Sequence, residues 1–162
     1  MSEVHNENFL KVRLNSLNPL EPIPFDLYVL INAKQILYTR KGDKIAAEKL
    51  DKFENKAPDA FFIKGSERPT YKKYIHDVLK NSNLDTKAKA IILRESSLTL
   101  VEELFESPDI ERALQESKII IGQFVDLMGE EPEAMAHLIG LSSHDFYTYT
   151  HSLDVGIYSL GL

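Results

Sequence analysis

The chain has 162 residues, 43% of them hydrophobic and 27% charged, which is enough apolar material for a buried core. Its formal net charge of -6 disfavours nucleic acid as a partner, and no apolar run approaches the ~20 residues that span a membrane. The lack of cysteine excludes a disulfide framework and a thiolate metal site, and the polar, acidic N-terminus is unlike a signal peptide, so we expect a cytoplasmic protein.

The first part of the chain has the patterns of short strands. Residues 9–14 alternate between apolar and charged side chains, and the later runs are β-branched and aromatic. A proline-rich loop at 15–24 and a short helix at 46–55 are expected between them. The expected strands are residues 9–14, 25–31, 35–39 and 60–63. We therefore expect residues 1–66 to form a small α+β head with an antiparallel sheet.

Helical periodicity begins after residue 66. The expected helices are residues 69–79, 85–106, 110–128 and 132–139. The third repeats apolar side chains at spacings of three and four, with Ser107 as its expected N-cap, which is typical of a bundle or coiled-coil seam. Residues 67–140 are thus expected to form a bundle-like helical body. The surplus apolar stripes over 85–128 indicate either a helical hairpin packed on the head or a homodimer formed through these helices.

The final segment, residues 141–162, is predicted to form one more helix and contains the order Tyr-Thr-x-x-His-Ser-x-x-Val from Tyr147 to Val155. This order resembles the opening helix of the HD-GYP family, the bacterial cyclic-di-GMP phosphodiesterases. In that family the histidine is the first ligand of a metal centre, so the resemblance implies that His151 is a metal ligand. The implied centre is a di-metal site, iron or similar, that activates a bridging water to attack a phosphodiester. Tyr147 stands where some three-metal members carry glutamate, which implies a two-metal parent site.

The later motifs of the family are missing, since neither a His-Asp pair nor a His-His-Glu…Gly-Tyr-Pro loop follows His151. The resemblance therefore implies a regulatory and sensory region plus the first helix of a catalytic domain. It implies one metal ligand, no complete catalytic set, no cofactor held by this chain and no activity by itself. The chain is expected to be a fragment of a metal-dependent cyclic-di-GMP phosphodiesterase or a natural short form. The head, from Pro24 to Tyr74, also resembles a regulatory domain found ahead of some HD-GYP outputs.

The other histidines are weaker candidates. His144 precedes His151 by seven residues, so their Cα atoms would lie ~10.5 Å apart on a helix, whereas two nitrogens on one metal each lie ~2 Å from it. The His76-Asp77 dipeptide precedes the His-Ser helix instead of following it, and we expect it to be structural. His137 lies in a short apolar helix, where packing is the expected role.

Charged clusters elsewhere in the chain predict exposed surface. The basic and aromatic stretch from Tyr71 to Tyr74 indicates either a solvated face or a contact for an acidic or phosphorylated partner. The acidic pairs at 102–103 and 130–131 are expected on solvated helix surface.

Two rival functions stay open. One is a stand-alone protein–protein interaction module in bacterial signalling, with a coincidental His-Ser segment. The other is a small enzyme with a histidine general base, although no nucleophile or oxyanion motif accompanies it.

Overall fold

The chain divides into two compact units, Met1–Tyr74 and Ile75–Leu162. The computed structural model describes residues 8–45, 61–81, 83–106, 109–141 and 148–161, with the backbone alone described at 104–106 and 148–152. The predicted helix at 46–55 lies outside these residues, and the three-part division into 1–66, 67–140 and 141–162 stays a prediction. None of the described helices is long and apolar enough to cross a membrane.

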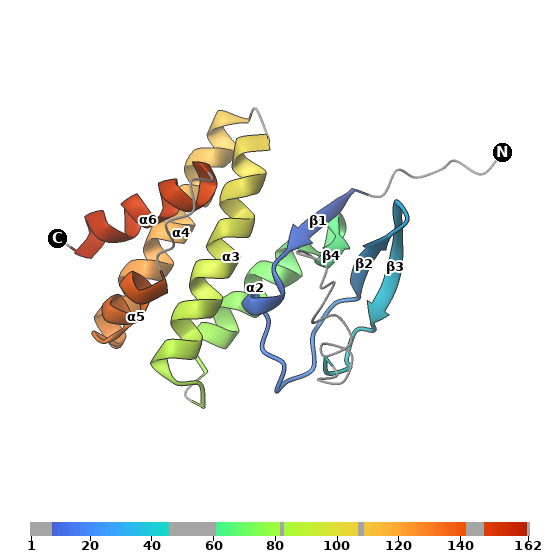
Figure 1. Ribbon diagram of the computed structural model, residues 1–162, viewed down its shortest axis with the longest axis horizontal. Coiled ribbons are helices and arrows are strands. Elements are labelled where there is room, and N and C mark those ends of the chain that lie inside the picture. Colours follow the sequence, from blue (N-terminus) through green and yellow to red (C-terminus); the bar gives the residue numbers. More distant parts are fainter. Residues whose placement is uncertain (1–7, 46–60, 82, 107–108, 142–147, 162) are drawn as a thin grey trace. The chain divides into compact units, whose positions relative to one another are not determined.

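The α+β class is confirmed, because an antiparallel sheet is followed in the sequence by helices (Figure 1). The elements are β1 (Phe9–Val12), β2 (Leu27–Ile31), β3 (Lys34–Thr39), β4 (Phe61–Lys64), α2 (Arg68–Leu79), α3 (Thr86–Glu106), α4 (Ile110–Glu130), α5 (Ala134–Leu141) and α6 (Thr148–Gly161).

The first unit is built on a four-stranded sheet with the strand order β1-β4-β2-β3. Leu10 of β1 lies opposite Ile63 of β4, and both side chains are buried, whereas Lys11 points to solvent. The predicted alternation in the first strand is therefore confirmed. The strand ends earlier than predicted because a 3-10 turn begins at Leu14, where the Ser16 hydroxyl donates to the Arg13 carbonyl at 2.6 Å.

A tight turn joins β2 to β3. Its two residues, Asn32 and Ala33, both have positive φ angles, 50° and 62°. Two positive φ angles define the type I′ turn, whose twist suits a two-residue hairpin. Asparagine enters this region readily, whereas the Cβ of alanine makes it unfavourable by about 1 kcal/mol. The hairpin therefore contains a strained residue that its strand pairing maintains.

Replacing Ala33 with Gly removes that strain. We expect the free energy of unfolding to rise by about 0.5–1 kcal/mol, measured by urea denaturation. The matched control is Ala136→Gly on the exposed side of α5, which should lower stability by about 0.5–1 kcal/mol because glycine is a poor helix former. A less stable A33G variant would contradict the assignment of strain.

Two buried tyrosines of α2 hold the loop that precedes β2. The Tyr74 hydroxyl accepts from the Asn18 backbone N–H at 2.7 Å, and the Tyr71 hydroxyl donates to Ser16 Oγ at 2.9 Å. Both rings meet Phe25 edge-on, with centroids 5.7 and 6.0 Å away. Burial raises the pKa of Tyr74 above its ordinary value. The basic and aromatic surface expected from Tyr71 to Tyr74 was therefore a wrong prediction in its aromatic part, because both tyrosine rings are buried.

Replacing Tyr74 with Phe leaves the N–H of Asn18, a residue that is 3% exposed, without its acceptor. We expect the free energy of unfolding to fall by about 1–3 kcal/mol, the range for an unsatisfied buried donor. Tyr158→Phe is the control, because Tyr158 is 46% exposed and its loss should change stability by no more than about 0.5 kcal/mol. Equal effects of the two substitutions would argue against the Asn18 bond.

The second unit is a helical body centred on α3. This helix packs against α4, α5 and α6, which gather around it in Figure 1. From Ile92 to Leu100 every side chain except that of Glu95 is buried. Over this stretch the prediction that the helix is covered on more than one side is confirmed.

The helix α4 begins at Ile110 and is capped by Asp109, whose carboxylate accepts from the Arg112 N–H at 3.1 Å. The prediction of Ser107 as the N-cap was wrong, because the helix begins at Ile110 and the residue directly before it, Asp109, is the N-cap. Arg112 also pairs with Glu103 of α3 at 2.6 Å, and the Glu103 side chain is only 23% exposed. The acidic pair at 102–103 is therefore not simply solvated surface.

Candidate functional site

The helix α6 carries the predicted metal ligand. His151 lies in its first half, where the backbone alone is described. The preceding segment, with His144 and Tyr147, lies outside the described residues. Further along the helix Asp154 and Ile157 are buried, at 5% and 1% exposed. The buried face of α6 therefore contains Asp154 and Ile157, which follow His151 along the helix.

A buried ion pair fixes α6 against α3. Arg94 Nη2 donates to Asp154 Oδ1 at 3.2 Å, and each side chain is 7% exposed. Asp154 follows His151 by three residues, just under one helical turn, so the pair holds the part of α6 that carries the histidine. Arg94 Nε is buried without a hydrogen-bond partner, so its guanidinium depends on Asp154 and on Glu95, 3.6 Å away, to offset its desolvation.

An apolar groove of about 390 Å³ lies between α3, α4 and α6. Its lining residues are Val101, Ser117, Ile120, Ile121, Phe124, Leu153, Gly156, Ile157, Ser159 and Leu160. None of these side chains is charged, so the groove lacks the cationic groups that bind phosphate oxygens. Its chemistry suits apolar side chains and not a dinucleotide.

The described residues offer no ready metal site. Among them, no three His, Asp or Glu side chains converge closely enough to hold an ion. His76 is exposed beside a water-sized cavity of about 20 Å³ that Lys80 and Glu130 also line. His137 is half-buried in α5. These residues therefore provide no donor set that fits a di-iron centre.

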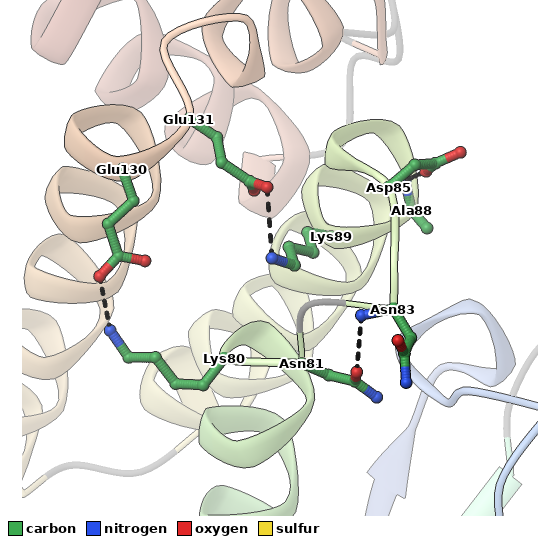
Figure 2. A network of polar contacts seen from close by, with 8 residues as sticks. All are labelled: Lys80, Asn81, Asn83, Asp85, Ala88, Lys89, Glu130 and Glu131. Atoms are coloured by element: carbon green, nitrogen blue, oxygen red, sulfur yellow. Dashed lines mark hydrogen bonds and ion pairs between the residues drawn. The ribbon is translucent and has the colours of Figure 1, made fainter.

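Two ion pairs tie the corner between α2 and α3 to the C-terminal end of α4, as Figure 2 shows. Lys80 Nζ lies 2.9 Å from Glu130 Oε1, and Lys89 Nζ lies 3.3 Å from Glu131 Oε1. The hydrogen bond between Lys80 and Glu130 raises the pKa of the lysine and lowers that of the glutamate. The Lys89 side chain is only 9% exposed and that of Glu131 26%. The prediction of solvated surface is therefore confirmed for Glu130 and wrong for Glu131.

Comparison with known proteins gives a structural likeness. No protein-family model matches the chain, and neither does any curated protein. A solved structure is similar to it: Bd1817, an HDG"Y"P protein from Bdellovibrio bacteriovorus, matches 94% of this chain with a TM-score of 0.65 and 25% sequence identity. The chain spans 52% of that protein, or about half its length. The fold of this chain is therefore HD-GYP-related, as the resemblance of the His151 segment predicted.

Sequence reasoning missed the pair between Arg94 and Asp154. One indication was present, because Arg94 follows the apolar run from Ala90 to Leu93 in a helix predicted to be covered on two sides. An arginine in such a helix is almost never fully buried unless it is paired. The identity of the acid could not be inferred, because Asp154 lies 60 residues away in the sequence.

Replacing Asp154 with Asn leaves the Arg94 guanidinium buried without its main counter-charge. We expect the free energy of unfolding to fall by about 3 kcal/mol, the cost of breaking a buried pair from one side, as measured by urea denaturation. Glu130→Gln is the control, because it breaks the exposed pair with Lys80 and should change stability far less. Similar losses in the two variants would contradict a special role for the buried pair.

Proposed function

We propose that this chain is the regulatory, sensory and dimerisation region of an HD-GYP-type cyclic-di-GMP phosphodiesterase, joined to the first helix of its catalytic domain. The observation that carries the proposal is the likeness to the HD-GYP protein Bd1817 over nearly the whole chain. The Tyr-Thr-x-x-His-Ser-x-x-Val segment, whose last residues lie in α6, supports the same assignment independently. An unrelated interaction module with a coincidental His-Ser segment does not account for that likeness.

In this proposal the parts of the chain have different tasks. Residues 1–66 receive a signal, residues 67–140 transmit it and dimerise, and residues 141–162 contribute to catalysis in the full-length parent. The described part of the head supports the first task, because its sheet has a buried core that includes Val12, Leu27 and Ile63. The proposal includes a cytoplasmic location, which is supported by a sequence without cysteine, the composition of a chain that uses no disulfides.

The proposal also holds that the chain is inactive by itself. His151 is the ligand that the family motif assigns to it, and the motifs that carry the other ligands do not follow in the sequence. A complete di-metal centre would supply the activation of water for attack on the phosphodiester. This chain would contribute the His151 imidazole, and the ion pair between Arg94 and Asp154 would fix the helix from which it projects.

The test is hydrolysis of cyclic-di-GMP by the purified 162-residue chain, with Fe²⁺ or Mn²⁺ present and the nucleotide products separated by chromatography. We expect no product above the blank, and no difference between the wild type and His151→Ala. A phosphodiesterase of known activity serves as the positive control. Metal-dependent hydrolysis by the wild type that H151A abolishes would overturn the claim that the chain is inactive.

A further inference from the structure

One side of α4 exposes four aliphatic side chains that lie along one line of the helix. Ile110, Leu114, Ile121 and Val125, called here the α4 stripe, are 76%, 61%, 50% and 49% exposed. At 100° per residue their Cα positions fall within one narrow sector of the helix. The buried face, with Ile120, Phe124 and Leu127, lies to one side of that sector. The stripe is therefore an exposed apolar face beside the buried one, and its member Ile121 also lines the edge of the groove next to α6.

The spacing of the stripe is symmetric. Its members are separated by four, seven and four residues, so the midpoint falls between Ser117 and Lys118. If two copies of α4 pair in an antiparallel manner about that midpoint, Ile110 faces the partner's Val125 and Leu114 faces the partner's Ile121. A two-fold interface requires such a self-complementary surface.

The centre of the α4 stripe allows two copies of the helix to approach each other closely. Ser117 is small, and its hydroxyl already donates to the Ala113 carbonyl at 2.7 Å, so burying it leaves no unsatisfied donor. Lys118 lies at the edge of the stripe and is exposed, and its long side chain allows the ammonium group to stay in water at the rim. No charged side chain stands within the stripe itself.

The exposed area also fits a second copy. The four side chains together expose roughly 400 Å² of apolar surface, as much as the largest apolar patch on a typical soluble monomer, and such a patch is often functional. Two copies with their polar rims would bury roughly 1,000–1,200 Å², which clears the minimum for a biological interface and is the size of a weak, reversible one. The corresponding side chains of α3, such as Leu93 and Leu98, are already buried and offer no surface for pairing.

We infer that the chain forms a homodimer through an antiparallel, two-fold pairing of the α4 stripe with that of a second copy. The inference rests on the proposed function, because it specifies the surface and geometry of its dimerisation role. It narrows the predicted dimer surface from residues 85–128 to one side of a single helix.

The first experiment is light scattering with size-exclusion chromatography on the 162-residue chain over a range of concentrations. We expect a mass twice the 18.5 kDa of one chain for the wild type. Ile121→Glu should raise the dissociation constant at least ~100-fold, because the two-fold axis introduces the change into the interface twice. Ile119→Glu is the matched control, since Ile119 is 47% exposed on the same helix but outside the stripe, and it should stay dimeric. Circular dichroism checks that both variants are folded.

The second experiment determines whether the two α4 helices of the dimer are antiparallel or parallel. The chain has no cysteine, so single cysteines report without background. In mixtures of Ile110→Cys and Val125→Cys chains, antiparallel pairing predicts mainly the mixed cross-link under mild oxidation, with little linkage between two I110C chains. Predominant linkage between two I110C chains would indicate parallel pairing and overturn the proposed geometry.

The outcomes separate this inference from the proposed function. A monomeric wild type, or a dimer that I121E and I119E affect equally, overturns the inference and leaves the hydrolysis result untouched. Hydrolysis of cyclic-di-GMP by the chain overturns the claim of inactivity and leaves the dimer surface untouched.

Discussion

A charge buried inside the helical unit constrains how its helices are arranged. The desolvation of Arg94 and Asp154 offsets much of the attraction between them, so the pair adds little net stability over an apolar packing of the same volume. Its main effect is on specificity. Any rotation of α6 that carried Asp154 away from Arg94 would leave a guanidinium in the core without its main partner, so the face that α6 turns to α3 is fixed. The orientation of the helix at His151 follows from that constraint.

The sequence was sufficient where an element has a single apolar face. In α2, which was predicted as a helix, Tyr71, Ile75 and Val78 are all buried at the spacing of one helix face, because a helix with one apolar side has one way to cover it. In α4 the apolar repeat runs through the neighbouring residues Ile120 and Ile121, yet these are 6% and 50% exposed. Periodicity gives the direction of an apolar face but not how much of its width neighbouring helices cover.

The sequence predicts one metal ligand from a motif, and it does not predict which other side chains would complete a site. A helix was predicted over the residues that form α6, Thr148–Gly161, because the order of residue types around the histidine is a local property. The ligands of a metal converge in space from several elements, and spacing within one segment does not encode that convergence. For the same reason the sequence did not predict the ion pair between Lys89 and Glu131. Lys89 was placed in a helix and Glu131 on solvated surface, and nothing in the sequence connected them.

The burial of α3 has a consequence for how the helical unit opens. Amide hydrogens in a fully covered helix reach water only when the whole unit unfolds, whereas those near exposed surfaces exchange through local fraying. Exchange between Ile92 and Leu100 therefore measures the global free energy of this unit, and exchange along the outer side of α4 measures local openings. Comparing the two helices would separate events confined to the surface of α4 from changes in the stability of the body beneath it.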